Sequence, residues 1–144
     1  MDILSVTMLI FCILESINVL ILYFWTDSKI GNGVGVFDVW EESKKDEVLA
    51  LFNHYMVYWV AGTKLIFIVL IGVILVTGSE ATKIGAVVAM IISIATYFWK
   101  LHPIISELDE RGKITPKNYS KVLGGMILGF LVMFSGALII HLLR

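Results

Sequence analysis

The chain has 144 residues, of which 58% are hydrophobic, and its formal net charge is −1. A soluble domain contains roughly 45–50% apolar residues, so the excess indicates a protein whose solvent is lipid. The nearly neutral charge and the lack of a basic patch argue against a partner made of nucleic acid. The single cysteine, Cys12, can form no disulfide within the chain.

Four apolar segments are long enough to cross a membrane as helices. They cover about residues 3–25, 48–77, 84–101 and 122–143. Each contains at least the ~18 mostly apolar residues that a hydrocarbon core of about 30 Å requires, and none has the alternating pattern of a barrel strand. The sequence therefore predicts an all-α integral membrane protein, a four-helix bundle in a single transmembrane domain over residues 1–144.

The basic residues predict how the helices are oriented. The loops 26–47 and 102–121, with the adjoining helix end, contain eight of them: Lys29, Lys44, Lys45, Lys100, Arg111, Lys113, Lys117 and Lys121. The other side has only Lys83 and Arg144. By the positive-inside rule, the first and third loops are cytoplasmic and both termini lie on the non-cytoplasmic side. We therefore expect a multi-pass protein of the plasma membrane.

Both long loops carry signals for short helices. Asp38, with a glutamate three residues later, fits a capping box, which predicts a helix from near Val39 that continues into the second span. Pro103 suits the start and Gly112 the end of a second helix, lying on the membrane surface with Ile104, Ile105 and Leu108 toward lipid. A protein partner, if the chain has one, is expected at these cytoplasmic loops.

Charged residues interrupt the first two spans at matched depths. Glu15 precedes Trp25 by ten residues, and Lys64 follows His54 by ten. If Trp25 and His54 mark the interface, both charges lie about 15 Å deep, near the middle of the bilayer. A lone charge there costs about 2.5–3.5 kcal/mol on insertion scales. We therefore predict a Glu15–Lys64 ion pair between two antiparallel helices.

Two asparagines extend this polar site. Asn18 is on the same helical face as Glu15, and Asn53 is on the face of Lys64 toward the cytoplasm. One interpretation is a small transporter or channel-like protein that moves protons, ions or a small solute past Glu15 and Lys64. The alternative is a non-catalytic scaffold or accessory subunit, in which the pair fixes helix register.

A carboxylate in the first of four short spans resembles the small multidrug resistance transporters. In that family the membrane glutamate binds protons and cationic substrate in turn, and the resemblance would give that role to Glu15. The loops here are much longer, however, and Lys64 would neutralise the carboxylate. The four-span layout is also similar to the membrane eicosanoid and glutathione enzymes, whose arginine-rich cofactor site has no match here. Both are likenesses of layout, and they assign the chain to no family.

No set of residues indicates an enzyme, a metal site or a cofactor. His54 and His102 lie toward the cytoplasmic side, and a pair of helix histidines could ligate haem or a metal. Interfacial polar residues are the simpler interpretation, because the sequence shows no pattern of residues that would hydrogen-bond and orient these rings as metal ligands. A nucleophile with a base and an orienting group is not evident either.

The fourth span carries small residues on one stripe, Gly125, Gly129 and Gly136. Such stripes let helix backbones approach closely. We expect a helix-packing seam here, either within the bundle or between the protomers of a homo-oligomer.

Overall fold

The computed structural model describes residues 2–31 and 33–143, and 82% of the chain is helical. Among these residues, four helical stretches are long and apolar enough to cross a membrane, which indicates an integral membrane protein. They are α1 (Ile3–Phe24), α3 (Glu47–Thr77), α4 with α5 (Glu80–Ala95 and Tyr97–Glu110), and α6 (Tyr119–Leu142).

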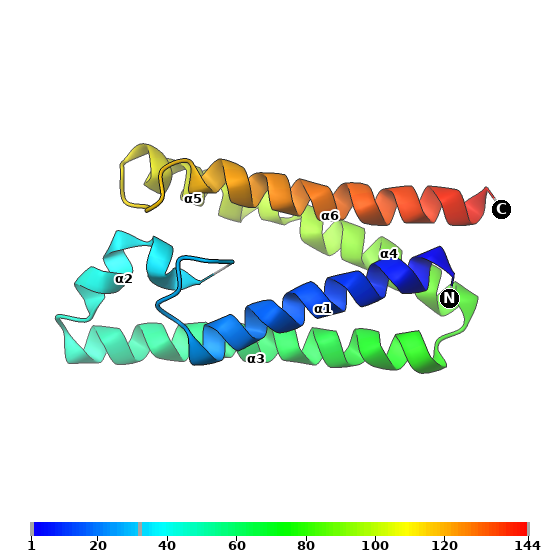
Figure 1. Ribbon diagram of the computed structural model, residues 1–144, viewed down its shortest axis with the longest axis horizontal. Coiled ribbons are helices and arrows are strands. Elements are labelled where there is room, and N and C mark those ends of the chain that lie inside the picture. Colours follow the sequence, from blue (N-terminus) through cyan, green and yellow to red (C-terminus); the bar gives the residue numbers. More distant parts are fainter. Residues whose placement is uncertain (1, 32, 144) are drawn as a thin grey trace.

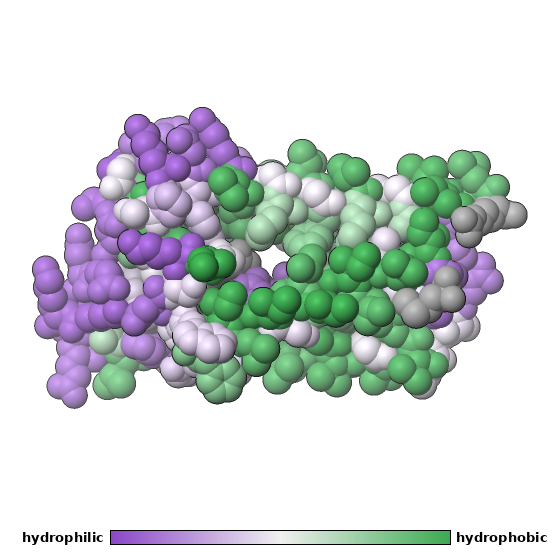
Figure 2. Space-filling model, in the orientation of Figure 1, coloured by the Kyte–Doolittle hydropathy of each residue, from purple (hydrophilic) through white to green (hydrophobic). Residues whose placement is uncertain are grey.

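The long helices run side by side and form a bundle with two different ends (Figure 1). α1 packs against α3, α4 and α6 and so lies centrally among them. Both chain termini lie at one end, here called the terminal end (Figure 1). The opposite end, the loop end, contains residues 25–46 and 111–118. In Figure 2 the loop end is mainly hydrophilic and the visible face of the helices is mainly hydrophobic.

Asp or Ser side chains cap the starts of three of the long helices. Asp2 accepts a hydrogen bond from the backbone N–H of Ser5 at 2.8 Å at the start of α1. Asp46 accepts bonds from the first backbone N–H groups of α3, and Ser79 caps α4. Each satisfies donors that a helix leaves unpaired in its first turn.

The third span differs from the prediction. The helix begins at Glu80 and continues to Glu110, with one break at Thr96, so residues 102–110 continue the spanning helix and the loop is confined to residues 111–118. The Thr96 hydroxyl donates to the carbonyl of Ser93 at 2.6 Å, a local bond that competes with regular helical pairing. Pro103 lies inside α5, so the prediction that it starts a separate helix is wrong.

The first loop also differs in detail. A short helix, α2 (Asp38–Ser43), does form, but it stops before α3 and does not continue into the span. Asp38 is its first helical residue and Phe37 its N-cap, without a side-chain cap bond, so the predicted capping box is wrong. The chain turns at Asp46, which caps α3. A 3-10 turn, η1 (Val34–Val36), precedes α2. In α5, Ile105 is buried in a cluster at the loop end and Leu108 packs against it, so the expected contact of Ile105 with lipid is wrong, whereas Ile104 is exposed.

Two apolar clusters hold the bundle together. The larger lies between α1, α3, α4 and α6 toward the terminal end; its buried members are Leu4, Met8, Cys12, Ile71, Val87, Phe134 and Ala137. The smaller lies at the loop end and is built around Val36, Ile105, Ile114 and Tyr119. The site considered next lies between them along α1 and α3.

Main-chain contacts join the two long loops. Phe37 and Ile114 form an isolated antiparallel bridge. The N–H of Thr115 donates to the carbonyl of Val36 at 2.8 Å, and the N–H of Asp38 donates to the carbonyl of Lys113 at 3.0 Å. The loops therefore form one connected layer over the loop end.

Candidate functional site: an ion pair inside the bundle

The structure brings Glu15 of α1 and Lys64 of α3 into direct contact. The Lys64 Nζ donates to the Glu15 Oε2 at 2.7 Å. Only 15% of the Glu15 side chain and 27% of the Lys64 side chain is exposed. Because α1 and α3 pack against one another along their length, their matched positions become neighbours. Each charge thus has its counter-charge within the apolar part of the bundle, where an unpaired charge is costly.

On the terminal side of the pair the bundle is apolar. Cys12, one turn from Glu15, is buried, and its Sγ lies 4.0 Å from the carbonyl oxygen of Ile68. Beyond it come Met8 and Ile71 of the larger apolar cluster. Next to the pair this direction is therefore filled by apolar side chains, and the buried polar residues of α1 on this side, Thr7 and Ser5, lie nearer the terminal end.

On the loop side, a groove of about 250 Å³ reaches Lys64. Lys64 is its one charged lining residue among those described; the others are Leu22, Val34, Met56, Val57 and Val60. The groove runs along the face of α3 between Met56 and Lys64, toward the loop end. The ammonium is therefore accessible from one side of the pair, whereas the other side is closed by packing.

The two asparagines of the predicted site lie apart from one another. Asn18 is buried, and its Oδ1 points to the loop, 3.8 Å from where a Cβ on Gly31 would lie. Asn53 is half-buried, eleven residues before Lys64 on α3, or about 16 Å along the helix axis. The residues in direct contact are therefore Glu15 and Lys64, with Asn18 on the loop side of them.

The predicted glycine stripe on α6 faces open space. A Cβ placed on Gly125, Gly129 or Gly136 would meet nothing within 4 Å in the described chain. The glycine that packs inside the bundle is Gly124, where a Cβ would lie 3.2 Å from the ring of His102. Of the two expectations for the stripe, the seam within one chain is therefore wrong, and the seam between protomers stays a prediction.

The two histidines at the loop end have separate surroundings. The Nδ1 of His54 lies 2.8 Å from the carbonyl oxygen of Ala50, and its ring packs on Trp40 with centroids 4.9 Å apart. The Nδ1 of His102 lies 3.4 Å from the hydroxyl of Tyr97. In the described part of the chain, no three His, Cys, Asp or Glu side chains group in a way that could hold a metal ion.

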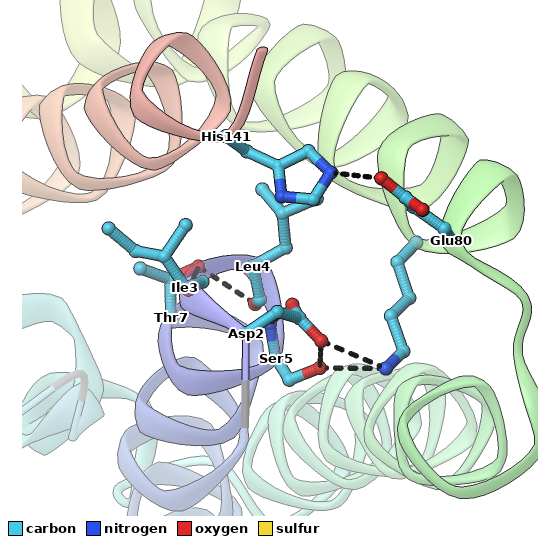
Figure 3. A network of polar contacts seen from close by, with 8 residues as sticks. Asp2, Ile3, Leu4, Ser5, Thr7, Glu80 and His141 are labelled. Carbon is cyan, nitrogen blue, oxygen red and sulfur yellow. Dashed lines mark hydrogen bonds and ion pairs between the residues drawn. The ribbon is translucent and has the colours of Figure 1, made fainter. Parts of the chain in front are cut away.

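Sequence reasoning missed a polar network at the terminal end (Figure 3). The Lys83 Nζ lies 3.3 Å from the Asp2 carboxylate and 2.8 Å from the Ser5 hydroxyl, and the Glu80 carboxylate lies 2.9 Å from His141 Nε2. Hydrogen bonds from Ser5, and then Lys83, hold the pKa of the Asp2 carboxyl below its usual range. These contacts join α1 to α4 and α4 to α6.

A second missed group lies at the loop end. The Asp109 carboxylate accepts bonds from the N–H of Asn118 at 2.9 Å, the N–H of Ser120 at 2.9 Å and the Ser120 hydroxyl at 2.6 Å. Asp109 is buried at the end of α5, so it fixes the start of α6. No short motif could have revealed this contact, because it depends on how the loop folds back.

Comparison with known proteins adds no assignment to this geometry. No family model, curated protein or solved structure matches the chain. The chemistry of the site is therefore inferred from its own residues.

Proposed function

We propose that the chain is a small transporter or channel-like protein that moves protons, ions or a small solute past Glu15 and Lys64. The observation that carries the proposal is the position of Lys64, which both pairs with Glu15 at 2.7 Å and ends a groove open toward the loop end. Ionisable residues inside membrane-spanning segments are rare, and they commonly mark ion or proton pathways.

In this proposal Glu15 is the titrating group and Lys64 its counter-charge. Taking up a proton on Glu15 would weaken its attraction to Lys64, and an anion entering the groove would compete for the same ammonium. Asn18 and Asn53 supply polar positions on the loop side. The apolar cluster beyond Cys12 closes the other side, so transport requires a change in the packing of α1 against α3.

The same proposal includes orientation and assembly. The loop end is cytoplasmic, because most of the Lys and Arg residues lie there, and the membrane is the plasma membrane. Protomers associate through Gly125 and Gly129 of α6, whose missing side chains leave open space on the surface of the single chain.

A second candidate function is a non-catalytic scaffold or accessory subunit. The closed apolar packing on the terminal side of the pair favours this second function. An ion pair without water access can have a purely structural role, which is to fix the pairing of α1 with α3. In that case a protein partner would bind the layer formed by the two cytoplasmic loops.

Flux measurements in proteoliposomes distinguish the two functions. Purified protein is reconstituted into separate vesicle preparations that contain a fluorescent indicator for protons, sodium, potassium or chloride, and the gradient of the matching ion is applied to each. The transport proposal expects a flux that Glu15→Gln abolishes and that Glu80→Gln, an exposed carboxylate outside the pair, leaves unchanged. A parent protein that passes none of these ions would contradict ion transport. A flux that is unchanged in Glu15→Gln would show that the ion pair is not part of the transport pathway.

A further inference from the structure

A cavity of about 530 Å³ lies at the loop end, away from the ion pair. Residues 23–28, which include the end of α1 and the turn after it, line one side, and His54 and Tyr58 of α3 line the other. Because α1 ends at Phe24, the cavity lies where an apolar span gives way to a polar loop. This is the depth at which lipid headgroups meet a membrane protein.

Aromatic rings form much of the cavity wall. The rings of Tyr23 and Tyr58 stack with centroids 5.7 Å apart, and the His54 ring lies 6.0 Å from that of Tyr58. Tyr23 and Tyr58 remain 37% and 42% exposed, so they are accessible to a ligand. The faces of such rings attract organic cations, above all quaternary ammonium groups.

The charge beside the cavity is negative, which favours the binding of a cation. The Lys44 ammonium is shared between Asp27 at 2.8 Å and Glu41 at 2.9 Å, so two carboxylates face one ammonium and one negative charge is in excess. Hydrogen bonds from Lys44 and from the Trp40 indole hold the pKa of the Asp27 carboxyl below its usual range. Asp27, a lining residue, is therefore ionised at neutral pH.

The wall is held in place by contacts from the first loop. The Trp40 Nε1 donates to the Asp27 Oδ1 at 2.6 Å, and the Trp40 ring packs on His54. The N–H of Ser28 donates to the carbonyl of Trp25 at 2.8 Å, which closes the turn after α1. The aromatic rings and the carboxylate are thus positioned before any ligand arrives, which lowers the ordering cost of binding.

We propose that this cavity binds the ammonium group of a zwitterionic phospholipid headgroup. A lipid fits better than a free ammonium compound, because exposed apolar residues of α1, among them Leu20 and Ile17, lead from the cavity toward the membrane centre. The proposal does not depend on transport through the ion pair.

Native mass spectrometry of the delipidated protein tests this proposal. The protein in detergent is incubated with equal amounts of phosphatidylcholine and phosphatidylglycerol that carry the same acyl chains. We expect bound phosphatidylcholine to exceed phosphatidylglycerol by about two- to fivefold, the size of one cation–π contact at a partly exposed site. A parent protein that binds both lipids equally would overturn the proposal.

Four variants test whether the preference for phosphatidylcholine arises at this cavity. Tyr58→Leu and Asp27→Asn should bring the ratio close to one, whereas Tyr58→Phe, which keeps the ring, should retain it. The matched control is Tyr55→Leu, because Tyr55 lies on the same helix, stacks on Trp59 and is outside the cavity wall.

Further outcomes of these measurements decide between the site and its alternatives. A preference that survives in both Tyr58→Leu and Asp27→Asn, or that Tyr55→Leu also removes, would contradict the site. Should Tyr58→Leu lower the melting temperature strongly, Asp27→Asn decides alone, since an asparagine Oδ1 can still accept from Trp40. Displacement of bound phosphatidylcholine by choline chloride at equal concentration would assign the cavity to a soluble ammonium and overturn the lipid proposal.

Discussion

The ammonium of Lys64 lies 2.7 Å from the carboxylate of Glu15, although the two residues are 49 positions apart in the chain. The contact joins the first two spanning helices at one level. It also makes the two residues energetically dependent on one another, because removing either leaves the other charge without its counter-charge.

The first prediction is a strong coupling between these two residues. Glu15→Gln and Lys64→Met should each destabilise the protein by about 3 kcal/mol, since each leaves a single charge in the apolar bundle. The double variant should recover most of the loss. Thermal unfolding of the parent, the two single variants and the double variant in nanodiscs gives the coupling energy as a double-mutant cycle. Effects that simply add would show that the pair contributes no coupling, and a fully stable Glu15→Gln would mean that the carboxylate is not kept for folding.

The second prediction concerns Asp109. Asp109→Ala should destabilise the protein by about 2–3 kcal/mol, because it leaves the N–H groups of Asn118 and Ser120 without their acceptor. Glu107→Ala on the same helix is the control, since its exposed ion pair with Arg111 should contribute less than about 1 kcal/mol. Chemical unfolding followed by helical circular dichroism compares the two. Equal losses would show that the buried contacts do not stabilise this junction.

The third prediction is a dependence of stability on pH at the terminal end. The pKa of the Asp2 carboxyl is lowered in the folded protein, chiefly by the Ser5 hydrogen bonds. Asp2 therefore contributes stability that is present above the unfolded pKa of about 3.9 and is lost as the pH falls toward the lower folded value. Asp2→Asn, which can still cap α1, should flatten the decrease in melting temperature below about pH 4.

The comparison that checks this is a set of melting curves between pH 7 and pH 3. Asp46→Asn, which changes the corresponding cap of α3, is the comparison variant, because the described contacts of that carboxylate are the N–H groups of Val48 and Leu49, with no serine hydroxyl among them. An Asp2→Asn protein with the same acid decrease as the parent would assign that decrease to other carboxylates.

The fourth prediction concerns assembly. Gly129→Leu should lower the mass of the detergent-solubilised particle to that of a single chain and leave the helical content unchanged, because a side chain at Gly129 meets nothing in its own chain. Gly72→Leu is the matched control on α3, where a Cβ also meets open space. Light scattering measures the masses. A parent that is already monomeric would contradict the proposed homo-oligomer.

The sequence predicts the spans well because each helix must satisfy its own backbone in lipid, and apolar length reports that requirement. Glu15 and Lys64 could be placed together for a similar reason: depth follows from residue count along a helix. Contacts between loops carry no such periodic signal. The bridge between Phe37 and Ile114 and the bonds of Asp109 depend on how the two loops fold onto each other.

The third span shows a different limit. A proline usually indicates a helix start or end, yet Pro103 lies within α5, where it removes one backbone donor. The helix is broken instead at Thr96, whose hydroxyl donates to the backbone carbonyl of Ser93. The sequence shows which glycines of α6 share a face, but not which face of α6 turns toward the bundle. The glycine that faces His102 is Gly124, which lies outside the predicted stripe.

Among the described residues, main-chain hydrogen bonds between segments far apart in the chain occur at the loop end and not at the terminal end. Main-chain hydrogen bonds join Val36 to Thr115 and Asp38 to Lys113 at the loop end, whereas side chains such as Lys83 and His141 make the contacts between helices at the terminal end. Side-chain bonds can open one at a time without unfolding any backbone. If the helices separate, the loop end therefore acts as the hinge and the terminal end opens. Slow hydrogen exchange of the Asp38 and Thr115 amide protons would indicate that the hinge stays closed.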